Sequence, residues 1–192
     1  MKNIAVFCSG GGTNFQSVID AVEAGEIKAN IACLVASKDN IGAIDRAKKH
    51  NIPYFVFDKS NYGSLLEMYG QIIGKLKTLN IDLIVFAGYL SAVTPDFIGA
   101  YNNRIINIHP SLLPKYGGKG MYGLKVHEHV INAKEKVSGC TVHYVDEGTD
   151  TGRIIAQTKV PVLENDTPES LQQRVLIEEH KLLIEVIQNL TK

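Results

Sequence analysis

The chain has 192 residues, and 20 Lys and Arg residues balance 20 Asp and Glu residues, so its formal net charge is zero. A chain of this length is expected to fold as one domain with a sizeable core, without needing a disulfide or a structural metal. The balanced charge argues against the basic surface with which proteins bind nucleic acid or an anionic membrane. A large polyanion is therefore not an expected partner.

The three cysteines, Cys8, Cys33 and Cys140, are widely spaced among apolar or β-prone neighbours. This odd number and wide spacing argue against a disulfide framework and against a zinc site. The first apolar run ends at Ser9, far short of a signal peptide or of the roughly 20 apolar residues of a membrane span. The sequence predicts buried thiols, a cytoplasmic location, no membrane contact and no bound metal.

Short β-branched runs alternate with longer amphipathic segments through the first 110 residues, which is typical of a parallel α/β sheet. Strands are expected at Ile4–Cys8, Ile31–Ala36, Tyr54–Phe57, Leu83–Ala87 and Arg104–Ile108. Helices are expected at Asn14–Ala24, at Ala43–Lys49, within Tyr62–Leu79 and, after a cap at Thr94, from Pro95. The predicted fold is a Rossmann-like, mostly parallel sheet with helices on both faces.

The pattern changes after His109. A Pro- and Gly-rich loop follows from Pro110 to Gly123, and its length suggests a function beyond connection. The elements expected beyond it are a helix at Leu124–Ala133, an antiparallel strand pair at Ser138–Val145 and Ile154–Val162, and a long C-terminal helix capped by Thr167.

The segment Ser9-Gly10-Gly11-Gly12-Thr13-Asn14 joins the first expected strand to the first expected helix. Its backbone N–H groups and the positive helix end would face the carboxyl edge of the sheet, a geometry that binds phosphate. Phe15 replaces the third glycine of a dinucleotide fingerprint, so a single phosphate fits better than a pyrophosphate. The alternative is a tight turn whose glycines serve the backbone alone.

The run Arg104–Pro110 is the second candidate site. Period-2 alternation places Asn107 and His109 on one face of the strand and Ile106 and Ile108 on the other. An amide and an imidazole would then leave the carboxyl end of a central strand side by side, where open α/β sheets bind ligands. A lone histidine is more often structural, but the pairing with Asn107 favours a functional site.

Two acidic features complete the candidates. The turn from Asp146 to Gly152 would, by itself, be a solvated hairpin. Glu179 falls on the apolar face of the last helix, where a carboxylate needs a partner, either an ion pair inside the fold or a ligand cation. His127 and His129 do not face each other on a helix, so they are not expected to bind a metal.

Four segments match a single known pattern: Ser9 to Asn14, Ala87-Gly88-Tyr89-Leu90, Asn107-Ile108-His109-Pro110-Ser111-Leu112-Leu113-Pro114, and Asp146 to Gly152. Together they resemble the glycinamide ribonucleotide formyltransferases, a family of folate-dependent enzymes of purine synthesis. The resemblance implies one formyltransferase domain over 1–192, with a phosphate-binding half at 1–110 and a folate-side half at 111–192. It implies 10-formyltetrahydrofolate as co-substrate, glycinamide ribonucleotide as formyl acceptor, and a monomer or homodimer.

The resemblance also implies roles for single residues. Asn107, His109 and Asp150 would form the catalytic group, and the Asp150 carboxylate is expected to raise the pKa of His109. The residues implied to bind the ribonucleotide are Gly12, Thr13, Asn14 and Glu179, the last at its amino end. The residues implied to contact the folate are Leu90, Ser91, Ala92, Val93, Asn107, Asp146, Glu147, Gly148 and Thr149.

Two departures from the family pattern leave contacts unassigned. In the family, an arginine at the start of the third helix contacts the folate, but the matching place in this chain, near Leu65, has no arginine. The segment Met121-Tyr122-Gly123 lies in a loop slightly longer than that of the family members. Ribose contacts in that loop therefore do not carry over.

Other functions stay open at this point. They are a related formyltransferase acting on another phosphorylated amine, a formyltetrahydrofolate hydrolase, a nucleotide-dependent oxidoreductase and a non-catalytic sensor of a phosphoribosyl ligand. Phe15 and the acid-free end of the second strand, Ala36-Ser37-Lys38, argue against the oxidoreductase.

Overall fold

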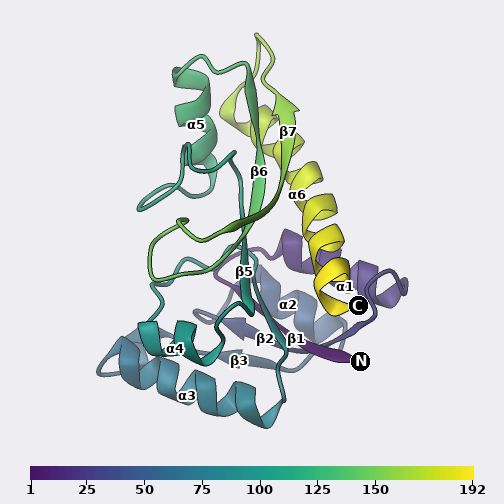
Figure 1. Cartoon of the computed structure of the whole chain (residues 1–192), viewed down its shortest axis with the longest axis vertical. Coiled ribbons are helices and arrows are strands. Elements are labelled where there is room, and N and C mark those ends of the chain that lie inside the picture. The colour runs from purple at the N-terminus through teal and green to yellow at the C-terminus, as the bar shows by residue number, and fades with distance from the viewer.

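Seven strands form one sheet in the order β3-β2-β1-β4-β5-β6-β7 in the computed structural model, which describes residues 1–192 (Figure 1). The strands are β1 (Lys2–Cys8), β2 (Ala29–Ala36), β3 (Tyr54–Val56), β4 (Leu83–Phe86), β5 (Ile105–His109), β6 (Val137–Tyr144) and β7 (Ile154–Pro161). Neighbours from β3 to β5 are parallel, whereas β6 runs antiparallel to both β5 and β7. The predicted mixed sheet is confirmed.

Helices cover both faces of this sheet (Figure 1). They are α1 (Thr13–Glu23), α2 (Gly42–Lys49), α3 (Leu65–Thr78), α4 (Pro95–Ala100), α5 (Leu124–Asn132) and α6 (Pro168–Thr191). The expected strands and helices begin and end within two residues of these bounds, except at the start of α3.

The third helix begins at Leu65, three residues into the stretch Tyr62–Leu79 within which it was expected. The Ser64 hydroxyl accepts a hydrogen bond from the Glu67 N–H at 3.1 Å, and the Glu67 carboxylate accepts one from the Gly63 N–H at 3.0 Å. These bonds satisfy backbone donors that a helix end leaves unpaired, and they fix the start of the helix. The apolar periodicity alone did not reveal this cap.

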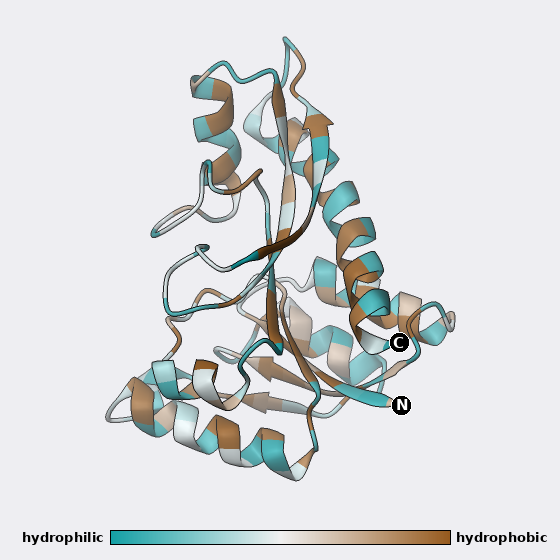
Figure 2. Ribbon diagram, in the orientation of Figure 1, coloured by the Kyte–Doolittle hydropathy of each residue, from teal (hydrophilic) through white to brown (hydrophobic).

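The parallel strands are apolar throughout because both of their faces are buried. In β1, Ile4 and Val6 pack in the larger core with α1, α2 and α6, whereas Ala5 and Phe7 pack in a second core with α3 and α4. Figure 2 shows the apolar residues concentrated on these strands and alternating with polar ones along α6. No helix of the structure has both the length and the apolar character needed to cross a membrane.

The three cysteines lie in these cores and are unpaired, as predicted. Burial raises the pKa of Cys8, Cys33 and Cys140 to about 12. These thiols therefore stay protonated at neutral pH and serve as small apolar side chains.

The long helix α6 brings one polar side chain to the sheet edge where the functional residues gather. Thr167 caps it through a reciprocal hydrogen-bond pair with Ser170, and Leu171, Val175 and Leu182 are buried along its apolar stripe. Glu179 lies on the same stripe, as the sequence predicted, and is only 7% exposed. Its position beside α1 makes it part of the site.

Candidate active site

A cavity of about 880 Å³ lies where β1, β4 and β5 end, at the carboxyl edge of the parallel strands. Its walls come from the first turn of α1, the segment after β4, the end of β5 with its following loop, the β6–β7 turn and α6. Every predicted site residue lines this cavity except Gly12, which adjoins it as the N-cap of α1. The fold thus brings together segments that are up to 165 residues apart, as in the bond between Asn14 and Glu179.

The predicted alternation along β5 is confirmed. Asn107 and His109 both line the cavity, whereas Ile106 and Ile108 pack in the larger core, although part of Ile108 also borders the cavity. His109 is 4% exposed, and Asn107 is half-buried. The strand therefore presents an amide and an imidazole to the cavity from one face.

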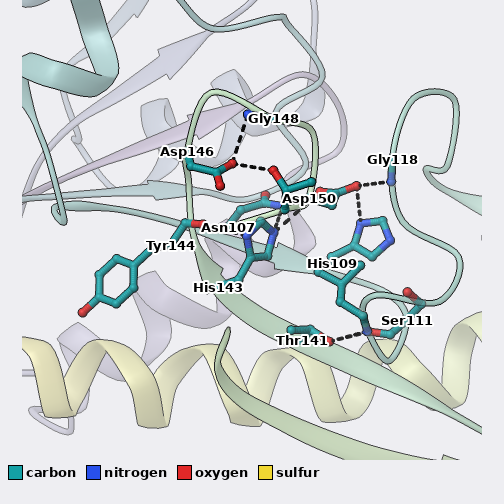
Figure 3. A network of polar contacts seen from close by, with 12 residues as sticks. Asn107, His109, Ser111, Gly118, Thr141, His143, Tyr144, Asp146, Gly148 and Asp150 are labelled. Carbon is teal, nitrogen blue, oxygen red and sulfur yellow. Dashed lines mark hydrogen bonds and ion pairs between the residues drawn. The ribbon is translucent and has the colours of Figure 1, made fainter. Parts of the chain in front are cut away.

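Asp150 is the centre of a polar network that joins these two side chains (Figure 3). Its Oδ2 accepts a hydrogen bond from the Gly118 N–H at 2.9 Å and lies 3.5 Å from His109 Nδ1. Its Oδ1 lies 3.5 Å from Asn107 Nδ2 and 3.6 Å from His143 Nε2. The Asp146–Gly152 turn is therefore not a free, solvated hairpin, because it carries a largely buried carboxylate into the site.

The backbone of Asp150 adopts the left-handed conformation, with φ of 58°. Aspartate tolerates this region better than most residues, yet such a conformation persists only where the surroundings hold it. Burial raises the pKa of Asp150, but the nearby His143 ring, the positive charge of a protonated His109 and the hydrogen bond from the Gly118 N–H together bring that pKa below its ordinary value. The carboxylate is therefore ionised at neutral pH.

The His109 ring lies between two oxygen acceptors. Its Nε2 is 2.9 Å from the Tyr116 carbonyl oxygen and its Nδ1 faces Asp150, so only the protonated ring donates to both. Burial lowers the pKa of His109, and the opposing effects of Asp150 and the Tyr116 carbonyl do not restore its usual value. The prediction of a raised pKa is therefore wrong, because it counted the carboxylate and not the loss of water around the ring.

His143 is the principal site residue that the sequence reasoning missed. Its Nδ1 donates to the Tyr144 carbonyl oxygen at 2.8 Å, and its Nε2 faces the Asn107 amide. The amide nitrogen of Asn107 lies 3.1 Å from that Nε2 and donates to it. His143 thereby fixes which way the Asn107 amide points.

The antiparallel register explains this contact, since Asn107 pairs with His143 and His109 pairs with Thr141. The signal in the sequence was the period-2 alternation that puts Thr141 and His143 on one face of the predicted strand. That signal becomes informative only once the register against β5 is known.

The loop after His109 is held by side chains outside the cavity. Thr141 Oγ1 donates to the Ser111 carbonyl at 2.6 Å and accepts from the Leu113 N–H at 3.1 Å. Glu135 accepts from the Tyr116 hydroxyl at 3.0 Å. These bonds hold the Tyr116 carbonyl at its place beside the His109 ring.

Glu179 does not form an ion pair inside the fold, so that alternative is excluded. Its Oε2 accepts a hydrogen bond from Asn14 Nδ2 at 2.8 Å, and no cationic side chain contacts it. Burial raises the pKa of Glu179, and the Asn14 amide partly opposes this effect. The carboxyl group keeps acceptor capacity for a donor that enters the cavity.

The loop before α1 presents unused backbone donors. Gly12 is the N-cap with φ of 71°, and no side chain caps the helix. The N–H groups of Gly11, Gly12, Thr13 and Asn14 donate to no acceptor within the protein. Together with the positive end of the helix, they form the arrangement that binds a phosphate group.

The remaining walls contain the predicted folate contacts. Leu90, Ser91, Ala92 and Val93 follow β4, and Asp146 shapes the opposite turn by accepting from the Gly148 N–H at 3.0 Å. Two lysines and no arginine line the cavity, namely Lys59 and Lys119. The folate-contacting arginine of the family pattern is therefore absent near Leu65. Of the basic residues that line the cavity, Lys59 is the nearest to Leu65 in the sequence.

Metal ligands are not grouped in this structure, because no three His, Cys, Asp or Glu side chains are arranged to hold an ion. His127 also lines the cavity, with its Nδ1 buried and without a partner. Burial lowers the pKa of His127 to about 4, so this ring is neutral at physiological pH.

The fold and the cavity define an α/β protein in which an uncapped helix N-terminus adjoins an amide, an imidazole and a carboxylate at the carboxyl edge of the sheet. Residues 2–187 match the family described as formyl transferase, and the chain belongs to that family.

Individual relatives agree with this assignment. The chain is 42% identical over 187 residues to an Arabidopsis thaliana protein named phosphoribosylglycinamide formyltransferase, chloroplastic, an alignment that covers 97% of this chain and 64% of that relative. It is 40% identical over 190 residues to the Bacillus subtilis phosphoribosylglycinamide formyltransferase, covering 99% of this chain and 95% of the relative. The chain thus spans less than two thirds of the plant relative and nearly all of the bacterial one.

A solved structure gives the same result for the fold. The crystal structure of glycinamide ribonucleotide transformylase 1 from Geobacillus kaustophilus is 41% identical in sequence and superposes with a TM-score of 0.94 over 100% of both chains.

Proposed function

We propose that this protein transfers the formyl group of 10-formyltetrahydrofolate to the amine of glycinamide ribonucleotide, in de novo purine biosynthesis. The observation that carries the proposal is the placement of Asn107, His109 and Asp150 in one cavity with the open N-terminal end of α1. The names of the relatives support the same substrates. In this proposal residues 1–110 form the phosphate-binding half of a single domain and 111–192 its folate-side half.

The ribonucleotide phosphate binds at the α1 end. The free N–H groups of Gly12, Thr13 and Asn14 can each donate to a phosphate oxygen, and the helix dipole favours the negative charge. Glu179 accepts a hydrogen bond from the amino end of the substrate, which supplies the donor that its buried carboxyl group needs. The pterin of the folate lies between Leu90–Val93 and the turn Asp146–Thr149.

The reaction is attack by the substrate amine on the formyl carbon. A bond forms between the amine nitrogen and that carbon, and the carbonyl oxygen gains negative charge. As the C=O bond re-forms, the bond from that carbon to the folate nitrogen breaks; the folate nitrogen gains one proton, and the amine nitrogen loses one in exchange. One N–H of the Asn107 amide donates to His143, and the other faces Asp150 with an N···O distance of 3.5 Å. Because a contact of this length is weak, the second N–H can donate to the formyl oxygen instead. Such a donor is typically worth about 10²–10³ in rate.

His109 and Asp150 handle the proton. The His109 Nδ1 contact with Asp150 is also long, at 3.5 Å, and apo contacts of this kind commonly tighten when substrate binds. Negative charge on the formyl oxygen favours the protonated ring, which stabilises that charge and passes a proton toward the leaving folate nitrogen. The ionised Asp150 carboxylate supports the ring in this charged form.

The proposed setting of the protein is the cytoplasm. Cys8, Cys33 and Cys140 are all free thiols, which is compatible with a reducing cytoplasm. The co-substrate is 10-formyltetrahydrofolate, no metal takes part, and the protein acts as a monomer or homodimer on small molecules.

A formyl-transfer assay of the purified protein against a panel of phosphorylated amines tests the proposal. We expect glycinamide ribonucleotide to be the best acceptor, with loss of turnover in His109→Ala. Preferential transfer to another amine, such as an amino sugar phosphate, would assign a different acceptor. Consumption of 10-formyltetrahydrofolate without any amine would identify a hydrolase, and tight binding of both substrates without turnover would identify a sensor.

A further inference from the structure

The backbone carbonyls of the phosphate loop are turned toward α2. The Ala43 N–H donates to the Gly10 carbonyl oxygen at 3.1 Å, and Arg46 Nε donates to the Gly11 carbonyl oxygen at 2.8 Å. Both donors belong to α2, a helix that does not line the cavity. The loop is thus held from behind by a neighbouring element.

This arrangement determines the direction of the N–H groups. In a planar trans peptide, the C=O of one residue and the N–H of the next point in opposite directions. A Gly10 carbonyl fixed on Ala43 therefore directs the Gly11 N–H away from α2. A Gly11 carbonyl fixed on Arg46 directs the Gly12 N–H away from α2 in the same manner.

Close packing leaves the loop little room to move toward α2. A Cβ at Gly12 would lie 2.8 Å from the Ala43 Cβ, and one at Gly42 would lie 3.2 Å from the Gly11 Cα. The loop and α2 therefore pack closely, and the only side chain at these two contacts is the Ala43 methyl group. Arg46 supplies the only side-chain hydrogen bond to a loop carbonyl at this contact.

Arg46 is itself held in place. Its Nη1 donates to Gln16 Oε1 at 3.1 Å, and Gln16 Nε2 donates to Asp20 Oδ1 at 2.8 Å. The half-buried guanidinium thus bridges the loop and the first turns of α1 with two donors of one planar group. A lysine would keep the charge but could not reproduce both bonds with this fixed geometry.

We propose that Arg46 is a positioning residue for the phosphate subsite. By donating to the Gly11 carbonyl, it holds the Gly12 N–H in the orientation that donates to a phosphate oxygen, without contacting the phosphate itself. The inference rests on the proposed function, since that function places the ribonucleotide phosphate at this loop.

Binding of inorganic phosphate to the intact protein tests the inference without relying on turnover. We expect Arg46→Met to bind phosphate about tenfold more weakly than the wild type, the loss expected for one well-placed hydrogen bond. Arg46→Lys should restore part of the affinity. Lys49→Met, which removes the same charge from an exposed position on the same helix, should bind as the wild type does.

Two further measurements separate positioning from general damage. The amide NMR signal of Gly12 should shift on phosphate addition in the wild type and much less in Arg46→Met. The KM for glycinamide ribonucleotide should rise about tenfold in Arg46→Met, while kcat and the KM for the folate stay within about twofold. A tenfold fall in kcat in Arg46→Met with an unchanged KM for glycinamide ribonucleotide would overturn the inference.

The outcomes distinguish this inference from the proposed function. Equal phosphate affinity in wild type and Arg46→Met would overturn the role of Arg46 and leave the proposed reaction intact. Weakened phosphate binding in a protein that transfers no formyl group would support the role of Arg46 and overturn the reaction. Absence of phosphate binding in the wild type would overturn both the subsite and the inference.

Discussion

The two ends of the cavity are built from different chemical groups. At the α1 end, the donors are backbone N–H groups of Gly12, Thr13 and Asn14, fixed by a helix and by contacts to α2. At the β5 end, the groups are the side chains of Asn107, His109 and Asp150, which meet from separate segments. The first set cannot change its charge, whereas the second contains groups that titrate.

This difference matches two tasks. A phosphate has the same charge throughout the proposed reaction, and fixed dipoles bind it with little reorganisation. The formyl oxygen gains and loses charge, and a buried imidazole beside a carboxylate can respond to that change. Changes at the α1 end should therefore alter binding, and changes at the β5 end should alter the chemical step.

The largest effects are expected at β5. Asn107→Ala and His109→Ala should each lower kcat by about 10²–10⁴, because both side chains act on charge that develops only in the transition state. The KM for the ribonucleotide should change little. Steady-state kinetics, with thermal unfolding as a check on folding, test this; activity within a few-fold of the wild type would remove that residue from the catalytic group.

Asp150→Asn comes next, with an expected loss in kcat on the order of 10²-fold at neutral pH. Burial lowers the pKa of His109 and the Asp150 carboxylate opposes that effect, so removing the charge should lower the pKa further. Activity that needs the protonated ring should then decline at lower pH than in the wild type, as the ring gives up its proton sooner. The loss of activity at acidic pH comes from protonation of the substrate amine, so the pH at which it occurs should change much less.

The measurement is kcat against pH for both proteins, with the His109 ring followed by NMR. An Asp150→Asn protein that keeps full activity, or a His109 pKa that does not fall, would show that the contact between Asp150 and His109 has no catalytic role.

The same contrast explains what could be predicted from the sequence. The phosphate loop is local, since strand, glycines and helix follow one another from Lys2 to Glu23, and its geometry follows from that order. The alternation along β5 was equally local and gave Asn107 and His109 their common face. Asp150 came from the family resemblance, because its turn alone indicated a solvated hairpin.

Long-range features were harder to predict. The contact of His143 with Asn107 depends on the β5–β6 register, which no pattern within either strand specifies. The pKa of His109 depends on how deeply the ring is buried, and that depth follows from the packing of the loop around Tyr116. Sequence spacing shows which groups can meet but not how much water they lose.

Smaller effects are expected at the phosphate loop. Thr13→Asp should raise the KM for glycinamide ribonucleotide about tenfold to thirtyfold, because it places a negative charge on an exposed first-turn position beside the phosphate. Gly12→Val should act in the same direction, since its side chain would clash with Ala43. The KM for the folate should rise less in both, and titration calorimetry showing unchanged ribonucleotide binding would put the phosphate elsewhere.

The smallest effect concerns His143, which belongs to the β5 end but touches no substrate in the proposed reaction. His143→Ala removes the acceptor that orients the Asn107 amide, and we expect kcat to fall about fivefold to tenfold with an unchanged KM for the ribonucleotide. His143→Gln keeps an acceptor and should recover part of the loss. His129→Ala, which removes an exposed imidazole from α5, should have no effect.

A double-mutant cycle shows whether His143 acts through Asn107. If it does, His143→Ala should cost almost nothing further in a protein that already carries Asn107→Ala, because the amide that His143 orients is gone. If the two losses instead multiply, His143 contributes to turnover by another route, and its 3.6 Å contact with Asp150 Oδ1 becomes the alternative. The cycle thereby shows whether His143 acts by orienting the Asn107 amide or by supporting the pair formed by His109 and Asp150.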